Sequence, residues 1–170
     1  MKRLAGLPLF LASLAFAQDA EITFSSSELE PGIFMIEAKG GFGGGNMAVL
    51  VGDDHVVMID DSMPPLAETL LVHVTETAGG PIDFMINTHV HGDHVGGNAY
   101  FADRGTVVFA HDNIRKRLLE DSSGAGGAEG LPVITFGDGV TFHLGNIEAR
   151  VNHLPKAHTD GDAAVYFPQA

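Results

Sequence analysis

The sequence predicts a mixed α/β fold in which helices cover a β-sheet. The chain has 170 residues, 45% of them apolar and 18% charged. These values suit one domain with a real hydrophobic core and argue against global disorder. From about residue 28 onward, short apolar runs alternate with segments of helical periodicity and with glycine-rich turns. That alternation is typical of a sheet packed against helices.

The first half of the chain contains four predicted strands. Residues 33–37 form the first. Residues 47–51 and 55–59 form a hairpin pair across Gly52-Asp53-Asp54. Residues 84–86 are a short buried strand, and the polar segment 88–98 follows it.

A helix is predicted between the third and fourth of these strands. Ser62 is its expected N-cap, and Pro64 and Pro65 fall in its first turn, where a missing N–H does no harm. The helix ends before Gly79. Its apolar face, at helical spacing, consists of Leu66, Leu70, Leu71 and Val74.

The second half repeats the pattern with further strands and one helix. Asp112 is the expected cap of a helix whose apolar residues are Ile114, Leu118 and Leu119. Residues 122–130 show no hydrophobic pattern and predict a connecting loop. The strands are expected at residues 107–110, 140–144, 147–154 and 163–167.

The N-terminus has the pattern of a secretory signal peptide. Lys2 and Arg3 precede an apolar run over residues 4–16, and Ala15-Phe16-Ala17 is a small-x-small cleavage site. Thirteen residues at about 1.5 Å each are too short to span a hydrocarbon core of roughly 30 Å. We therefore expect residues 1–17 to be removed, leaving residues 18–170 as one periplasmic or secreted domain without stable membrane association.

Charge and cysteine content exclude several classes of function. The formal net charge is −13, so binding of nucleic acid through a basic surface is not expected. The chain has no Cys, which excludes thiolate metal sites and cysteine nucleophiles. A metal must then be held by carboxylates and by some of the nine His residues.

The most informative motif is Thr88-His89-Val90-His91-Gly92-Asp93-His94, directly after the predicted strand 84–86. His89 and His91 point the same way on an extended segment and can hold one metal together. Asp93 shares that parity, and the turn at Gly92 lets His94 reach a second position. Such nitrogen and carboxylate ligands suit Zn²⁺ or a similar divalent metal.

A second motif, residues 157–162, lies between two predicted strands and contains His158. His158 is the expected third ligand of a tetrahedral site whose fourth position is left for water. His111, His143 and His153 do not fit either motif, and we interpret them as ordinary surface or hydrogen-bonded residues.

The two motifs, together with Val57-Met58-Ile59-Asp60 in the same order, resemble the metallo-β-lactamase superfamily over roughly residues 28–167. The resemblance implies a four-layer αββα sandwich with the metal site at one edge, between the two sheets. It implies that His89, His91 and His158 bind a first zinc. Asp93 and His94 then supply a second zinc, with Asp93 also orienting or deprotonating the attacking water.

Two further positions have a role only through this resemblance. Asp60 alone reads as a turn residue, but the family places there a carboxylate that orients a ligand imidazole. The segment 40–46 reads equally as a glycine-rich hairpin turn or as the family's substrate flap, with Phe42 at its tip.

The chain departs from the family at its C-terminus. Family members continue with a bridging carboxylate or Cys and a final His. We therefore expect a C-terminally truncated chain with an incomplete second half; the alternative is a reduced domain with one well-formed and one incomplete metal site. The missing part of the second sheet predicts an exposed, helix-free apolar face.

The resemblance implies a secreted zinc hydrolase in which metal-bound hydroxide attacks the carbonyl of a small-molecule β-lactam, lactone or thioester. Two alternatives stay open: a mononuclear iron oxygenase of the same fold, and a non-catalytic zinc-binding fragment. One or two zinc ions, or iron, are all compatible with the motifs. The oligomeric state is not predicted.

Overall fold

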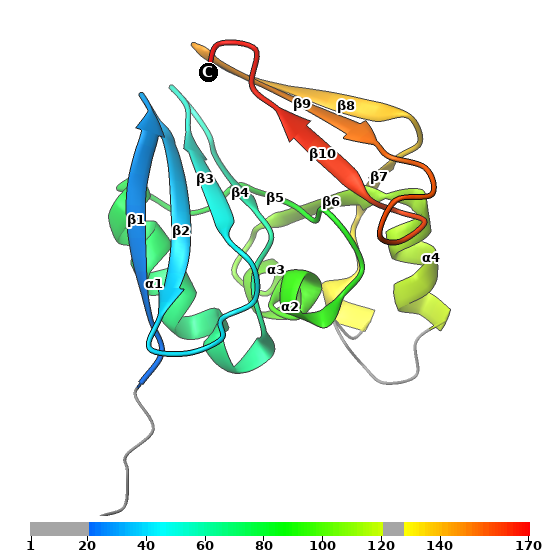
Figure 1. The fold of residues 1–170 in the computed structure, drawn as a ribbon, viewed down its shortest axis with the longest axis horizontal. Helices are drawn as coiled ribbons and strands as arrows, with labels where there is room; N and C mark the ends of the chain where they lie inside the picture. The colour runs from blue at the N-terminus through cyan, green and yellow to red at the C-terminus, as the bar shows by residue number, and fades with distance from the viewer. Residues whose placement is uncertain (1–20, 121–127) are drawn as a thin grey trace, which may run out of the picture.

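The computed structural model describes residues 21–120 and 128–170, which form two β-sheets and several helices (Figure 1). The predicted signal peptide and most of the predicted loop 122–130 lie outside the described residues. A seven-stranded sheet has the strand order β1 to β7, and a three-stranded sheet has the order β10-β9-β8. The strands are β1 (Thr23–Glu30), β2 (Ile33–Lys39), β3 (Met47–Val51), β4 (Val56–Ile59), β5 (Phe84–Ile86), β6 (Val107–His111), β7 (Ile134–Phe136), β8 (Gly139–Leu144), β9 (Ile147–His153) and β10 (Ala163–Tyr166).

Pairing in the large sheet changes from antiparallel to parallel at β4. The pairs from β1 to β4 are antiparallel, and those from β4 to β7 are parallel. Parallel neighbours need a crossover, and helices supply it here. The helical segments are η1 (Pro64–Leu66), α1 (Ala67–Ala78), α2 (Gly92–Val95), α3 (Asn98–Ala102), α4 (Asp112–Glu120) and η2 (Ala128–Gly130).

Both faces of the large sheet are buried, and alternate residues of its strands serve different cores. Met58 of β4 packs with Leu70 and Val74 of α1, whereas its neighbour Val57 packs with the small sheet. The small sheet therefore covers one face of the large sheet and α1 covers the other (Figure 1). This explains why the central strands read as unbroken apolar runs.

Helix α4 packs beside these cores in a small cluster of its own. Ile114 and Leu118 of α4 are buried with Val95 of α2 and Ala110 of β6. Leu119, predicted on the same apolar face, is 62% exposed instead. The cluster joins α4 to α2, the helix that follows the His89-His91 motif.

The predicted mixed α/β fold is confirmed, with the expected strands extended or shortened by one or two residues. Strand β1 and strand β7 were not predicted, and neither were the short helices α2 and α3. Helix α1 ends at a left-handed Gly79, as expected.

Both predicted helix caps are wrong. The 3₁₀ turn before α1 has Met63 at its N-cap, and Ser62 instead donates its hydroxyl to the backbone oxygen of Gly43, at 2.5 Å. Asp112 is the first residue of α4 rather than its cap. Nδ1 of the preceding His111 accepts the N–H of Asn113 at 3.2 Å, which is the bond that a capping side chain makes.

The expected exposed apolar face on the small sheet is also wrong. No described helix lies over the outer face of β8–β10, but its exposed side chains are mostly polar, as in an antiparallel sheet that faces water. The exposed residues of these strands are Gly139, Thr141, His143, Arg150, Asn152, Ala164 and Tyr166. In residues 21–120 and 128–170, no helix is long and apolar enough to cross a membrane.

Candidate metal centre

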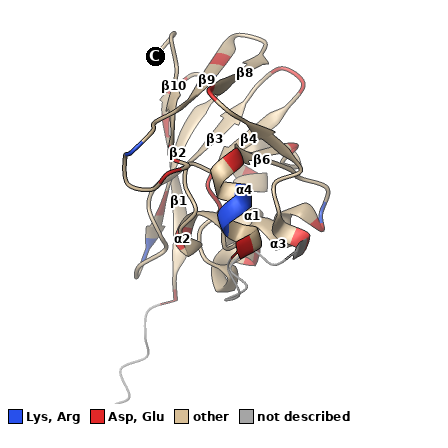
Figure 2. Cartoon of the chain, turned by 90° about the vertical axis from the view of Figure 1, so that its right-hand side faces the viewer, with Lys and Arg blue, Asp and Glu red and all other residues tan. Residues whose placement is uncertain are grey.

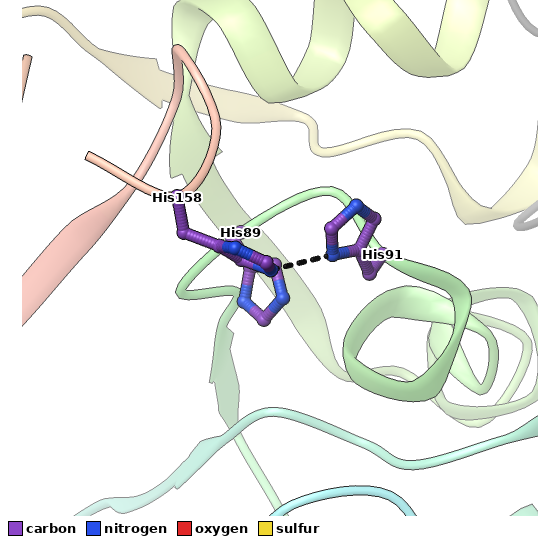
Figure 3. A group of neighbouring side chains, drawn as sticks. All are labelled: His89, His91 and His158. Carbon is purple, nitrogen blue, oxygen red and sulfur yellow. Dashed lines mark hydrogen bonds between the residues drawn. The ribbon is translucent and has the colours of Figure 1, made fainter. Parts of the chain in front are cut away.

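The candidate site lies where β4 and β5 end, beside the loop between β9 and β10. Strand β4 is followed by Asp60, and β5 leads into His89 and His91. His158 comes from the β9–β10 loop, which crosses the same edge (Figure 3). Carboxyl ends of parallel strands are where α/β sheets commonly build sites.

Three of the predicted ligands converge. One nitrogen from each of His89, His91 and His158 lies within 4.8 Å of the others. Nε2 of His158 is 2.9 Å from Nδ1 of His91, as the dashed line in Figure 3 shows. The sequence motifs 69 positions apart are therefore brought together by the two-sheet packing.

Hydrogen bonding orients the ring of His89. The Thr88 hydroxyl lies 2.7 Å from Oδ2 of Asp60 and 3.2 Å from Nδ1 of His89. Because the hydroxyl donates its one proton to the carboxylate, its oxygen accepts from Nδ1 of His89. This leaves Nε2 of His89 with a free lone pair for a metal.

His94 and Asp93 form a second group at the start of α2. Nδ1 of His94 lies 2.8 Å from Oδ2 of Asp60, and Nε2 of His94 lies 3.5 Å from Oδ2 of Asp93. The rings of His94 and His89 are 3.9 Å apart between centroids. The structure thus places all five predicted ligands in one cluster, with Asp60 behind it.

Local charges shift the pKa values of two of these rings in opposite directions. Burial and the nearby His94 ring lower the pKa of His89 below 6.5. Burial also opposes charge on His94, but its hydrogen bond to Asp60 and the charges of Asp60 and Asp93 raise its pKa. His89 is therefore the more readily neutral ring, which is the form that binds metal.

The loop that carries His158 is shaped by one buried carboxylate. Oδ2 of Asp162 accepts the backbone N–H of His158 at 2.6 Å, and Oδ1 accepts that of Thr159 at 2.9 Å. The Thr159 hydroxyl also donates to Asp162. Burial opposes ionisation of Asp162, yet these hydrogen bonds lower its pKa.

The glycine-rich segment 40–46 lies directly against the second group. A Cβ on Gly44, which has φ +88°, would meet the backbone oxygen of Asp93 at 2.7 Å. A Cβ on Gly45 would lie 3.1 Å from Cε1 of His94. Phe42 in the same segment is 67% exposed. The segment is therefore adjacent to the cluster, and Phe42 is free to contact a ligand from solvent.

Sequence reasoning missed several polar residues under the site. Asp61 is fully buried; its Oδ1 accepts the N–H of Gly97 at 2.9 Å, and its Oδ2 has no partner. Burial is the largest cause raising its pKa, and Asp60 adds to it. Asn87 and Asn98 bond each other through both amides and are fully buried. Asn87 directly follows β5, and only that position, not the residue type, could have indicated its place under the site.

The remaining histidines lie apart from the cluster. His111 is buried and stacks on His153, with ring centroids 3.7 Å apart and planes at 18°. Nε2 of His153 lies 3.2 Å from the backbone oxygen of Asp160. His143 is exposed on the outer face of β8.

The donor set fits a divalent metal of the zinc type. Three imidazoles without sulfur, with a carboxylate and a fourth imidazole beside them, are ligands of this class. At Zn–N distances of about 2.0–2.1 Å, tetrahedral ligand nitrogens lie about 3.3 Å apart. The 2.9 Å separation of the His91 and His158 nitrogens is within a few tenths of an ångström of that spacing.

Fold and cluster together define a two-sheet α/β protein with a histidine-rich candidate metal site. The family model described as the metallo-beta-lactamase superfamily matches residues 40–170. The chain therefore belongs to this superfamily.

Individual relatives agree with this membership. A hydroxyacylglutathione hydrolase of Methylococcus capsulatus is 31% identical over 107 residues, which are 62% of this chain and 37% of that protein. A metallo-beta-lactamase type 2 of Bacteroides fragilis is 23% identical over 92% of this chain and 61% of its own length. The chain thus matches less than two thirds of each of these relatives.

Solved structures confirm the fold. A metallo-beta-lactamase from Pontibacter korlensis superposes with a TM-score of 0.71 at 22% identity, covering 86% of this chain and 68% of its own. The metallo-beta-lactamase IND-7 gives a TM-score of 0.71 at 23% identity, covering 86% and 67%. The expected metallo-β-lactamase-like fold is confirmed, with three of its four layers formed by the described residues.

Proposed function

We propose that this protein is a metal-dependent hydrolase that cleaves a small molecule at a carbonyl group. The observation that carries the proposal is the convergence of the His89, His91 and His158 nitrogens within 4.8 Å. Asp93 and His94 lie beside them, with Oδ2 of Asp93 3.5 Å from Nε2 of His94. Three imidazoles gathered this closely would repel one another when protonated, and a shared metal ion would hold them together in the neutral form.

The residues divide into two sets of ligands. His89, His91 and His158 hold the first metal, and Asp93 and His94 hold the second. Asp60 orients His94 by accepting from its Nδ1, and supports His89 through Thr88. We propose zinc as the metal, because imidazole and carboxylate donors suit it.

A bound divalent metal supplies an acidic water near neutral pH and polarises the carbonyl. Asp93, whose side chain is partly exposed at the edge of the cluster, would help to hold the second metal and would be placed to orient a water there and to accept its proton. The exposed faces of His91 and His158 leave this side open for a substrate. Phe42 then covers the apolar part of the substrate from the segment 40–46.

The substrate class is a β-lactam, a lactone or a thioester. Support comes from relatives named for a thioester substrate and for β-lactams, the hydroxyacylglutathione hydrolase and the type 2 metallo-beta-lactamase. Lys2, Arg3 and the apolar run that follows support export to the periplasm or exterior. Export favours the β-lactam class, whose targets lie outside the cytoplasm.

Metal analysis and a substrate panel test the proposal. Purified chain is analysed for metals and assayed with a chromogenic cephalosporin, a lactone and an acyl thioester. We expect zinc and turnover of one of the three. Asp93→Asn should reduce kcat about 10²–10⁴-fold, whereas Asp103→Asn, at an exposed helix end, should not. Zinc without turnover of any substrate would reject the hydrolase, and one iron per chain would favour the oxygenase.

A further inference from the structure

The loop that presents His158 needs support from outside itself. His158 and the four residues before it are all exposed, so little packing holds this stretch in place. Asp162 fixes the local turn, but both partners of that contact belong to the same loop. The position of the turn relative to His89 and His91 must come from another element.

Helix α4 makes the contacts that could supply this support, and they converge on Asp160. The side-chain amide of Asn113 donates to the backbone oxygen of Asp160 at 2.6 Å. Arg117, one turn further along α4, donates Nη2 to Oδ2 of Asp160 at 2.8 Å. The guanidinium of Arg117 and the carboxylate of Asp160 thus form an ion pair as well as a hydrogen bond. Figure 2 shows α4 with basic residues in its middle and acidic residues toward its ends, in agreement with its sequence DNIRKRLLE.

The backbone of the same loop packs directly against helix α4. A Cβ on Gly161 would lie 2.9 Å from Cγ1 of Ile114 and 3.1 Å from its backbone nitrogen. Ile114 is fully buried in the cluster that contains Val95 of α2. Helix α4 therefore touches the His158 loop on one side and the helix of Asp93 and His94 on the other.

We propose that Asn113 and Arg117 are positioning residues for His158, and that they act by holding Asp160. Only Thr159 separates His158 from Asp160, so a displacement of Asp160 moves the imidazole away from His89 and His91. This inference rests on the proposed metal site. It adds that α4 sets the affinity of that site.

The test measures zinc affinity of the full chain by competition with a chromogenic chelator. Asn113→Ala should weaken binding about two- to tenfold, the effect expected for one neutral hydrogen bond. Arg117→Ala should weaken it about two- to fivefold at low salt, and the effect should shrink toward none in roughly 1 M salt. Arg150→Ala removes a positive charge from an exposed position of β9, where it pairs with Glu148, and should leave the affinity unchanged.

The same substitutions made in two further variants test whether the loss of zinc affinity depends on Asp160 and His158. Arg117→Ala should have no further effect in an Asp160→Asn variant, and neither substitution should matter in a His158→Ala variant. A merely structural role for α4 would instead weaken binding in all backgrounds. Thermal unfolding of the metal-free variants checks that each one is folded.

The outcomes separate this inference from the proposed function. Zinc binding by the natural chain with unchanged affinity in Asn113→Ala and Arg117→Ala would overturn the role of α4 alone. No zinc binding by the natural chain would overturn the metal site, and this inference with it.

Discussion

Oδ2 of Asp60 lies 2.8 Å from Nδ1 of His94, and this one contact determines which nitrogen of His94 faces Asp93. With Nδ1 bound to Asp60, Nε2 is the nitrogen left 3.5 Å from the Asp93 carboxylate. The same Asp60 carboxylate accepts the N–H and the hydroxyl of Thr88, each at 2.7 Å. One buried side chain at the end of β4 therefore holds the start of the histidine motif.

Removal of this carboxylate should weaken metal binding more than it weakens the fold. We expect Asp60→Ala to lower zinc affinity about 10–100-fold, as loss of a partner behind a metal ligand typically does. Isothermal titration with zinc measures the effect. Asp103→Ala, which removes an exposed carboxylate at the C-terminal end of α3, is the control. Equal affinities for the natural chain and Asp60→Ala would contradict the orienting role.

Gly44 is required for two reasons, its left-handed backbone and its contact with Asp93. Gly44→Ala should destabilise the protein by about 1–3 kcal/mol because of the positive φ and the close backbone oxygen. It should also displace Asp93 and reduce the amount of second metal bound per chain. Gly80→Ala is the matched control, since a Cβ there meets nothing within 4 Å. Urea unfolding and elemental analysis compare the two; equal stability would reject the steric account.

Asp61 should make stability depend on pH in a direction unusual for a carboxylate. Burial raises its pKa above 3.8 in the folded state, so the unfolded chain ionises first as the pH rises. The unfolded state then binds fewer protons, and the contribution of Asp61 to stability, present below about pH 3.8, is lost progressively as pH rises toward the folded pKa.

Asp61→Asn removes this dependence while keeping an oxygen for the N–H of Gly97. The stability of the natural chain relative to the variant should therefore fall as the pH rises above about 3.8. Urea unfolding of metal-free protein at several pH values measures the difference. A difference that is constant with pH would show that Asp61 is ionised in the fold.

The sequence contains strong signals for the central strands and the ligands, and weak ones for the parts between them. Strands β3 to β6 are buried, so they appear in the sequence as apolar runs bounded by turn residues and can be predicted from it. The spacing of His89 and His91 predicts a pair of metal ligands from only a few neighbouring residues. The role of His158 was expected from its place in the motif 157–162 between two predicted strands and from the need for a third ligand, and the order of the motifs in the family supported it.

The missed features lack a local signal of their own. Strand β1 is polar and largely exposed at the edge of the sheet, so it shows little apolar pattern. Ser62 looks like a helix cap, but its positive φ and the approach of Gly43 direct its hydroxyl elsewhere. Asn113 and Arg117 read as ordinary helix surface, and only the folded chain places Asp160 against them.

The measurement closest to the central claim is the zinc affinity of His158→Ala beside that of His143→Ala. Both substitutions remove an exposed histidine from the second half of the chain, but only His158 lies with His89 and His91. We predict that the natural chain and His143→Ala bind zinc with the same affinity, and that His158→Ala loses about 100-fold or more, by analogy with losses seen for metal-site partners. Unchanged zinc affinity in His158→Ala would contradict the account, because the two halves of the fold would then not share a metal.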